Sequence, residues 1–511
     1  MTVGTAPVLV AGAGPVGLTA ALLLARWQVP AVVLEATARH EAVGSRSICV
    51  QRDVLDIYHR AGCAEPLVAR GVTWHRGRTF HRDRELFSVT FPDAGRSPYP
   101  GFVNIGQSEV ESALLDAVAA EPLVDLRYGH RVTGVHATGD TVTVEAAGRR
   151  FTGTHLIAAD GPRSTVRTLL GVEFPGRSYD DLFLIADIRA ELGFGAERRF
   201  HFDPEWNPGR QVLVHPQPDS VWRIDWQVPA DYDLAEDTAS GGLDARIRRI
   251  TGDTPYTVRW CSIYRFHQRR AGRLRVGRVL LAGDAAHLMA PFGARGLNSG
   301  VQDAENAAWK IAYDRAGWAG PALLDSYATE RGAAADENLR VTGETMRFLV
   351  PRTDEEWAWR RDVLDRAVDD PVARSQVNSG KLAEPYWYVD SPLTTGRPPA
   401  GFPTGPDALR PPVAGVLCPD GPIAGGGRLR TLFGTAMTVL TCGLSLPDHE
   451  AEGPVGHYAI DRDPVLVEAL CAYHGWCAVV RPDGHLAAVL DRPDGRSLTT
   501  ALQRARGLAL D

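Results

Sequence analysis

The sequence has little that would place it in a membrane, on nucleic acid or outside the cell. Its longest apolar runs fall far short of the roughly 20 residues that a membrane-spanning helix needs. The net charge is −7, whereas nucleic-acid-binding surfaces are usually basic. The N-terminal segment lacks the basic region that precedes the apolar run of a signal peptide. We therefore expect a cytoplasmic protein with no membrane or nucleic-acid partner.

Cysteine is scarce and forms no recognisable pattern. The seven cysteines are scattered, and the closest pair, Cys471 and Cys477, is not a CxxC motif. This spacing favours free thiols in a reducing compartment. The sequence has no His/Cys/carboxylate cluster with ligand spacing, so we expect no metal. A chain of 511 residues is long enough for two or three domains.

A glycine-rich turn near the N-terminus joins a short apolar strand, residues 7–12, to a helix. Gly12 permits the tight turn, Gly14 lets a pyrophosphate approach the backbone, and Gly17 lets helix and strand pack closely. A second strand, "AVVLE", ends at Glu35, which suits a ribose contact. The spacing predicts a dinucleotide site but does not distinguish FAD from NAD. Two further residues of the turn belong to this candidate site: Pro15 and Val16.

Two more apolar strands end in an aspartate beside a glycine. One ends at Asp160 and Gly161, and the other ends at Gly283 and Asp284. Side chains at the carboxyl ends of parallel strands point into the ligand crevice of an α/β sheet. The second pair opens the segment "GDAAHLMAPFGARGLNSGVQDAENAAWKIAY", in which a loop rich in glycine precedes a helix. Such a loop lets backbone approach a flat ligand.

The rest of the chain divides into regions of different character. Residues 197–228 contain short alternating runs separated by turns, which predict an antiparallel sheet. A proline- and glycine-rich stretch at roughly 391–427 reads as a linker. A smaller unit follows, with strands, a helix in "DPVLVEALCAYHG", a hairpin turning at Pro482-Asp483-Gly484, and a final helix from Ser497.

Together, the three motifs resemble those of the single-component FAD-dependent aromatic hydroxylases, the flavoprotein monooxygenases that include p-hydroxybenzoate hydroxylase. The resemblance covers about residues 5–345, and the long GD segment is its most specific part. It implies an α/β fold with a Rossmann-like FAD-binding domain and an antiparallel-sheet substrate domain. The C-terminal unit resembles the thioredoxin-like domain of phenol and polyketide hydroxylases, without its CxxC. The expected boundaries are 1–175 with 276–390 for the FAD domain, 176–275 with a contribution from 74–100 for the substrate domain, and 400–511 for the thioredoxin-like domain.

The resemblance assigns roles to individual residues. Asp284 would bind the ribityl chain of FAD, and the loop from Pro291 to Asn298 would wrap the isoalloxazine ring. A helix starting near Asn298 would aim its N-terminus at the flavin N1–C2 carbonyl. Arg46 matches the family arginine that reaches the flavin, and Gln107 matches a glutamine near FAD. The full set of cofactor candidates is Gly12, Gly14, Pro15, Val16, Gly17, Glu35, Arg46, Gln107, Asp160, Gly161, Gly283, Asp284, Pro291, Gly296, Leu297 and Asn298.

Residues 211–229 match the family segment that holds the aromatic substrate. Gln217 stands where benzoate hydroxylases place a carboxylate-clamping arginine, which favours a larger or neutral substrate. His215 is a candidate general base, and equally an ordinary polar residue. The substrate candidates are His215, Gln217, Trp222, Arg223 and Asp225, with Trp222 and Trp226 expected to stack on the substrate ring. The catalytic candidates are Pro291, His215 and Arg46.

The resemblance implies a monooxygenase that uses FAD, NADPH or NADH as transient co-substrate, and O2. The expected reaction hydroxylates a phenolic or polycyclic polyketide-like substrate through a C4a-hydroperoxyflavin. Baeyer–Villiger insertion on the same scaffold and a non-turnover protein that shields an intermediate stay open as alternatives. A plain NAD dehydrogenase is disfavoured by the GD loop. Besides the small-molecule substrate, a homodimer partner is left open.

Overall fold

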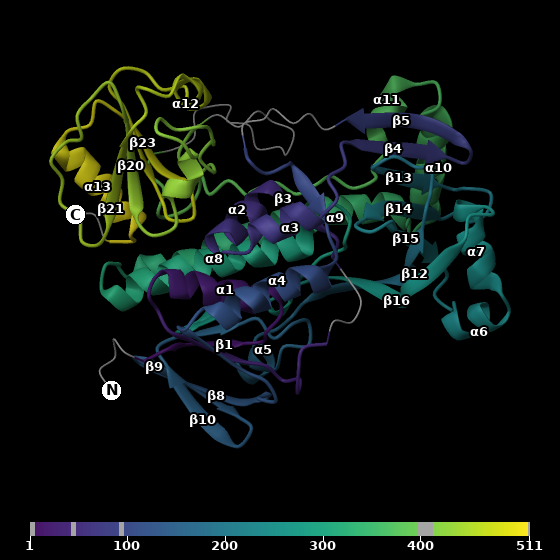
Figure 1. Cartoon of the computed structure of the whole chain (residues 1–511), viewed down its shortest axis with the longest axis horizontal. Helices are drawn as coiled ribbons and strands as arrows, with labels where there is room; N and C mark the ends of the chain where they lie inside the picture. The colour runs from purple at the N-terminus through teal and green to yellow at the C-terminus, as the bar shows by residue number, and fades with distance from the viewer. Residues whose placement is uncertain (1–5, 42–46, 91–96, 397–411, 509–511) are drawn as a thin grey trace.

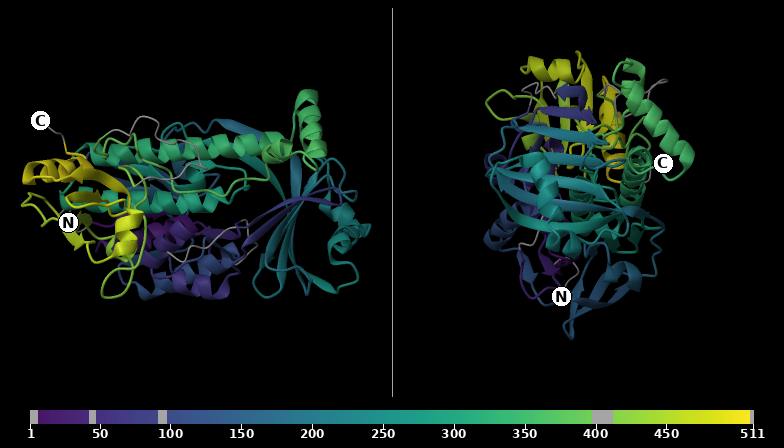
Figure 2. Two further views of the ribbon diagram at one scale, coloured as in Figure 1. Left: turned by 90° about the horizontal axis from the view of Figure 1, so that it is seen from above. Right: turned by 90° about the vertical axis from the view of Figure 1, so that its right-hand side faces the viewer.

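The computed structural model describes residues 6–41, 47–90, 97–396 and 412–508. Figure 1 shows an elongated arrangement, in which a small C-terminal unit and a large antiparallel sheet lie at opposite ends. Two long helices, α8 (Arg295–Ala316) and α9 (Ala322–Leu349), run along the body between these ends, as the left view of Figure 2 shows. The predicted α/β class is therefore confirmed.

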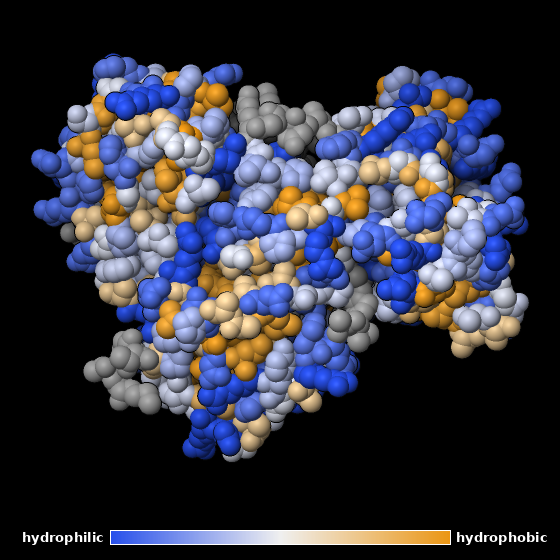
Figure 3. All heavy atoms as spheres, in the orientation of Figure 1, coloured by the Kyte–Doolittle hydropathy of each residue, from blue (hydrophilic) through white to orange (hydrophobic). Residues whose placement is uncertain are grey.

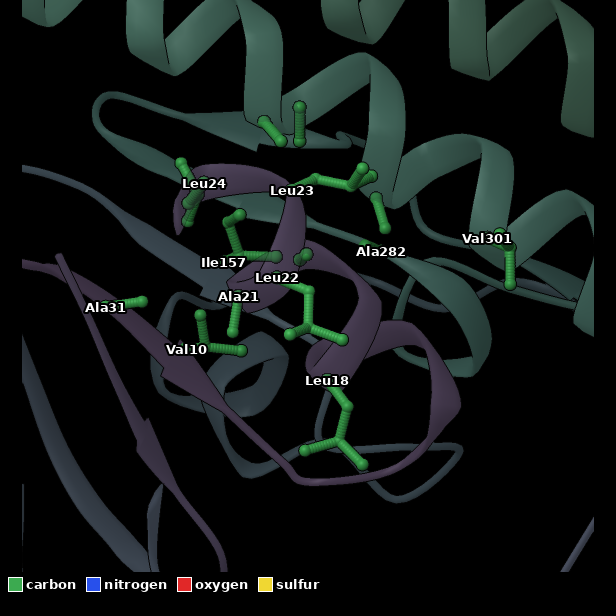
Figure 4. Packing of buried hydrophobic residues seen from close by; sticks show 14 of the residues in the cluster. Val10, Leu18, Ala21, Leu22, Leu23, Leu24, Ala31, Ile157, Ala282 and Val301 are labelled. Atoms are coloured by element: carbon green, nitrogen blue, oxygen red, sulfur yellow. The ribbon is translucent and has the colours of Figure 1, made fainter. Parts of the chain in front are cut away.

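The N-terminal part of the chain builds a mainly parallel sheet. Its strands are apolar and buried because helices and a small antiparallel sheet pack against it and share one hydrophobic core with it. Figure 4 shows Val10, Leu22 and Ile157 packed together in this core; each is buried. The strand β17 is antiparallel to its neighbour and the others are parallel. The sheet order is β17 (Arg275–Val276), β18 (Val279–Leu281), β11 (Leu156–Ala158), β1 (Val8–Ala11), β2 (Ala31–Leu34) and β7 (Val124–Arg127).

Around this sheet lie five further helices and two small sheets. Helix α1 follows β1 directly, and it packs against α8 and α4. The helices are α1 (Pro15–Arg26), α2 (Arg52–Arg60), α3 (Ala64–Arg70), α4 (Gln107–Ala120) and α5 (Thr165–Leu169). The small sheets comprise β3 (Cys49–Gln51) with β6 (Phe102–Asn104), and β8 (Val132–Thr138), β9 (Thr141–Ala146) and β10 (Arg149–Gly153).

The predicted antiparallel sheet is present and is larger than the runs at 197–228. It has eight strands, and two of them come from residues before 100. One face packs against α6 (Leu234–Ala239) and α7 (Gly242–Thr251), while the other faces the body. Helices α10 (Asp354–Arg366) and α11 (Pro371–Gln376) lie beside it. Its order is β19 (His287–Leu288), β16 (Tyr256–Arg270), β12 (Gly176–Ala190), β15 (Val221–Val228), β14 (Gln211–Gln217), β13 (Glu197–Phe202), β4 (Arg76–His81) and β5 (Arg84–Thr90).

The C-terminal unit has a four-stranded sheet with strand order β21, β20, β22, β23. The first two are parallel and the remaining pairs are antiparallel. The helix expected in "DPVLVEALCAYHG" is short and ends at Ala469. Residues 443–454, which join the first two strands of the unit, form no helix. The thioredoxin-like assignment stays a prediction. The elements are β20 (Met437–Cys442), β21 (Val455–Ala459), α12 (Pro464–Ala469), β22 (Trp476–Val480), β23 (Leu486–Asp491) and α13 (Gly495–Ala505).

The surface is mixed in polarity. On the face shown in Figure 3, hydrophobic atoms gather mainly over the region of α1 and α4, and hydrophilic atoms surround them. None of the helices in the described ranges is long and apolar enough to cross a membrane.

Candidate functional site

The three glycine-containing motifs converge at the start of α1. A Cβ placed on Gly283 would lie 2.9 Å from Val16 Cγ2, and one placed on Gly300 would lie 2.7 Å from the same atom. A Cβ on Gly12 would lie 2.4 Å from the carbonyl oxygen of Ala159, the residue before Asp160. The turn after β1, the end of β11 and the turn after β18 therefore pack directly against one another.

The glycines of the first turn differ in what requires them. Gly12 has φ +98°, and Gly17 would place a Cβ 2.0 Å from the Gly12 carbonyl oxygen. Gly14 instead has φ −75° and is the N-cap of α1 without a side-chain cap. A Cβ on Gly14 would meet nothing within 4 Å. The fold itself requires Gly12 and Gly17, and the space at Gly14 fits a pyrophosphate facing the helix N-terminus.

Glu35 lies beside the glycine-rich turn and holds it through a hydrogen bond. Its Oε2 accepts a hydrogen bond from the Ala13 amide at 2.8 Å, and its Oε1 accepts from the amide and hydroxyl of Thr37. A carboxylate offers about four acceptor positions, so one position is left for a ribose hydroxyl. The predicted ribose contact stays a prediction with a compatible geometry.

Asp160 has a structural role beyond the predicted cofactor contact. Its Oδ1 accepts from Ser164 Oγ at 2.5 Å and its Oδ2 accepts from the Val166 amide at 3.0 Å. These bonds hold the start of α5. The neighbouring Gly161 has φ +80° and open space at its Cβ position.

Two other cofactor candidates are Gln107 and Arg46. Gln107 is the first residue of α4 and donates a hydrogen bond to Glu111. Arg46 lies outside the described residues, so its role stays a prediction.

The turn at Gly283 and Asp284 is anchored from below by a residue that the sequence interpretation overlooked. Asp303, fully buried in α8, accepts from the Gly283 amide at 2.9 Å and from His287 Nε2 at 2.7 Å. These two anchors lie on either side of Asp284, which is half-buried in the turn. His287 is therefore buried and hydrogen-bonded to the same carboxylate as the turn. The anchors fix the backbone from which Asp284 would reach the cofactor.

Helix α8 begins three residues earlier than expected, at Arg295. Its N-cap, Ala294, has φ +56° and makes no side-chain cap, so the helix presents an uncapped N-terminus. Gly296 has open space at its Cβ position. Asn298 clamps the loop to β3: its Oδ1 accepts from the Gln51 amide at 3.0 Å and its Nδ2 donates to the Cys49 carbonyl at 2.9 Å. An open helix N-terminus suits a developing negative charge.

The remaining loop residues connect this N-terminus to the antiparallel sheet. Pro291 is exposed and its carbonyl accepts from the Ala294 amide, while Leu297 is half-buried. The ring of Phe292 lies 5.8 Å from the rings of both Phe183 and Phe266. The loop therefore packs against the inward face of the sheet, which places the cofactor candidates beside the substrate candidates.

Arg223 and Gln217 serve one buried carboxylate. Arg223 donates through Nε and NH2 to the two oxygens of Asp187, at 2.8 and 2.7 Å, and Gln217 Nε2 donates to Oδ1 at 2.9 Å. A bidentate, buried pair of this kind is strongly held. The charge of Arg223 is thus neutralised by Asp187. Gln217 binds the same carboxylate, so its side chain is committed to the protein and does not point freely toward a substrate.

The two tryptophans lie on the opposite face from the other candidates, which corrects the expected stacking role. Directly opposed residues on antiparallel strands share a face, and the pairs here are His215 with Arg223 and Ile224 with Val214. Trp222 and Trp226 alternate with Arg223, and both are buried against the α6 and α7 side. Their surface therefore belongs to the core behind the sheet and is closed to a substrate.

The inward face carries three polar side chains that lie close enough to influence one another electrostatically. Asp225 and His215 lie on neighbouring strands there, and Arg198 of β13 joins them as a residue that the sequence interpretation missed. Burial raises the pKa of Asp225 to about 7, although Arg223 opposes the shift. Burial, then Arg198 and Arg223, hold the pKa of His215 well below its usual range. His215 is therefore a weak proton acceptor, and its buried Nδ1 bonds to no described residue.

The sequence could have indicated that Arg198 lies on the inward face. Alternation along the strand "ERRFHF" puts it on the same face as the apolar Phe200. Its pKa is lowered to about 10 by burial. Asp303 lies inside the long GD segment, but nothing in its spacing marks it as an anchor. In the described ranges, no group of three or more His, Cys, Asp or Glu side chains is placed to hold a metal.

Comparison with known proteins identifies relatives over the whole chain. The family model described as "FAD binding domain" matches residues 5–342. The 6-methylpretetramide 4-monooxygenase of Streptomyces rimosus is 32% identical over 97% of this chain and 93% of its own length. The dialkyldecalin synthase of Streptomyces rugosporus is 33% identical over 67% of this chain and 73% of its own length. A crystal structure of the flavin-dependent monooxygenase PieE with FAD and substrate has a TM-score of 0.83 at 23% identity, covering 98% of both chains.

Proposed function

We propose, since the chain belongs to the family defined by this FAD-binding domain, that the protein is an FAD-dependent monooxygenase acting on a phenolic or polycyclic polyketide-like substrate. The observation that carries this proposal is the convergence of the three motifs at Val16, with Phe292 of the loop after the third motif packed against the inward face of the antiparallel sheet. One relative, by its name, is a monooxygenase of a pretetramide. NADPH or NADH is the co-substrate typical of such enzymes.

The chain's own residues would hold FAD at this convergence. The N-terminus of α1 would receive the pyrophosphate, Glu35 the ribose, and Asp284 the ribityl chain. The uncapped N-terminus of α8, from Ala294 to Leu297, would stabilise negative charge on the flavin ring. When bound, FAD supplies the transfer of reducing equivalents from NAD(P)H to O2. Asp303 and Asn298 hold the surrounding backbone through their hydrogen bonds, and the buried ring of Phe292 would help exclude water from the bound flavin.

The inward face of the sheet favours a neutral substrate. Of the two arginines there, Arg223 binds Asp187, and Arg198 donates to the Ser379 carbonyl and lies near Asp225. His215 is neutral because its pKa is lowered, so these five side chains are balanced in charge when Asp225, whose pKa is about 7, is ionised. A substrate carboxylate would add an unmatched buried charge, which costs several kcal/mol. A phenolic hydroxyl instead finds Asp225 as an acceptor and the free nitrogen of His215.

The test is a panel of neutral phenols, polycyclic phenols and simple hydroxybenzoates. We expect the purified protein to be yellow, absorbing at about 450 nm as flavin does. Neutral phenols should stimulate NAD(P)H oxidation and yield hydroxylated product, while hydroxybenzoates should do little. If 4-hydroxybenzoate is the preferred substrate, the charge argument is wrong and Arg198 acts as a carboxylate clamp.

A second candidate function is a flavin-fold protein that shapes a substrate without net oxidation. It is favoured by the relative named as a dialkyldecalin synthase. Substrate-stimulated NAD(P)H oxidation separates the two, because only the monooxygenase consumes the reductant. Baeyer–Villiger insertion consumes it too, and is recognised by an ester or lactone product.

Location and assembly belong to the same proposal. All seven cysteines are free, which supports a cytoplasmic location. A homodimer is tested by size-exclusion chromatography of the holoprotein.

A further inference from the structure

A buried chain of ion pairs runs from the C-terminal unit to the GD turn. It begins at Arg481 and Asp483, in the turn between β22 and β23. The Arg481 side chain is only 1% exposed. Arg481 donates to Glu330 of α9 through NH1 at 2.5 Å and NH2 at 2.9 Å. The C-terminal unit is thereby fastened to α9 by a two-pronged charged contact.

Glu330 gathers further partners from the body around this contact. Its Oε2 accepts from Lys310 Nζ at 2.7 Å and from Asn306 Nδ2 at 2.9 Å, and its Oε1 accepts from Ser391 Oγ at 2.5 Å. Burial opposes ionisation, but the charges of Arg481 and Lys310 hold the pKa of Glu330 well below its ordinary value. Glu330 is therefore a fixed, ionised centre.

The next residue of α9 points the other way, toward the GD turn. Arg331 donates to Asp303 Oδ1 through Nε at 2.5 Å and to the Tyr388 hydroxyl through NH1 at 2.7 Å. The Tyr388 ring in turn lies 4.4 Å from the ring of His485. Glu330 is thus bound by the C-terminal unit through Arg481, and its neighbour Arg331 binds Asp303 on the other side of α9.

Asp303 completes the chain because it binds the Gly283 amide and His287 Nε2. These two groups bracket Asp284. The C-terminal unit lies at the far end of the molecule from the antiparallel sheet (Figures 1 and 2), so a direct substrate contact is not its role. Its path to the site leads through α9 and Asp303.

We propose that Arg481 is a positioning residue for the FAD site. By holding Glu330 it fixes α9 where Arg331 holds Asp303, and Asp303 then holds the turn that presents Asp284. The C-terminal unit thereby sets FAD affinity. The inference rests on the proposed FAD contact at Asp284 and adds to it a task for the C-terminal unit.

The test compares two charge-balanced double variants. Glu330→Gln with Arg481→Met removes the pair in the chain, and leaves Lys310 to balance Asp483. The matched control is Asp56→Asn with Arg430→Met. That pair, at 2.7 Å, also joins the C-terminal unit to the body, but through α2. The control loses one largely buried ion pair between the same two parts of the molecule. The double variant in the chain loses the pair between Arg481 and Glu330, and with it the pairs of Arg481 with Asp483 and of Glu330 with Lys310.

The readouts are the FAD dissociation constant, from titration of the deflavinated protein, and the apoprotein melting temperature. We expect both double variants to melt earlier, and only Glu330→Gln with Arg481→Met to bind FAD at least tenfold more weakly. Equal FAD affinity in the two variants would overturn the inference. If the unaltered protein fails to bind FAD, the proposed function fails instead, so the two failures are distinguishable.

A gentler pair of variants covers the case in which the first double variant does not fold. Arg481→Lys keeps the charge but cannot reproduce the two-pronged contact, and Arg430→Lys is its control. We expect a weakening of FAD binding of about threefold or more for Arg481→Lys alone. An unchanged dissociation constant in a folded Arg481→Lys protein counts against the positioning role.

Discussion

One added methyl group should have opposite effects at two glycines of the same turn. At Gly12, alanine meets the Ala159 carbonyl oxygen at 2.4 Å and must adopt φ +98°. At Gly14, alanine meets nothing within 4 Å and keeps φ −75° with an extended ψ, which also suits a residue before proline. The pair separates what the fold needs from what the cofactor needs.

The expected magnitudes follow from these geometries. Positive φ costs a non-glycine residue about 1–2 kcal/mol, and overpacking a tight site costs about 1–3 kcal/mol. Gly12→Ala should therefore lower the free energy of unfolding of the apoprotein by about 2–5 kcal/mol, a large part of the usual 5–15 kcal/mol. Gly14→Ala should leave it unchanged or raise it by about 0.4–1 kcal/mol, because it restricts the unfolded chain.

For Gly14, the change to alanine should weaken FAD binding although it does not weaken the fold. Its added methyl group occupies the space facing the helix N-terminus, so we expect at least a tenfold loss of FAD affinity, about 1.4 kcal/mol, and a larger loss for Gly14→Val. The assays are denaturant unfolding of the apoprotein and FAD titration. A Gly14→Val protein that binds FAD normally would refute the location of the pyrophosphate, whereas one that fails to fold would refute the open geometry.

Two other changes probe the ends of the site. Asp284→Ala should purify with much less FAD while the apoprotein keeps its circular dichroism spectrum; a fully flavinylated and active variant would exclude the ribityl contact. Asp225→Asn should alter the pH dependence of apoprotein stability. Burial raises the pKa of Asp225 from 3.8 to about 7, so the protonated form stabilises the fold and this contribution is lost as pH rises through about 7. The Asn variant should lack that loss between pH 4 and 7, and an unchanged pH profile would show that Asp225 does not titrate there.

The first half of the site could be predicted because its chemistry follows local rules. A strand, a turn with glycines at fixed spacing and a helix occur within residues 7–28, and Gly12 and Gly17 have the predicted packing duties. The predicted runs at 197–228 also became β13, β14 and β15. In both cases neighbours in sequence determine the geometry.

The second half depends on neighbours distant in the sequence. Asp303, 20 residues after Gly283, acquires its role only because α8 folds back beneath the turn. Arg198 and Asp225 come onto one face through the pairing of β13, β14 and β15. Alternation indicates this neighbourhood only once the register of the strands is known.

Trp222 and Trp226 show why the strand could be predicted correctly while their role in the substrate site was predicted wrongly. Alternation placed Trp222, Ile224 and Trp226 on one face and Arg223 and Asp225 on the other, and that division is real. What the pattern does not contain is which face meets the cofactor. Large apolar side chains are as useful in a core as around an aromatic ligand, and here α6 and α7 supply the core. The face left for the substrate is the charged one, which a protein tolerates only when the charges are paired. The pairing of Arg223 with Asp187 is therefore the physical condition under which this face can stay open to a neutral ring.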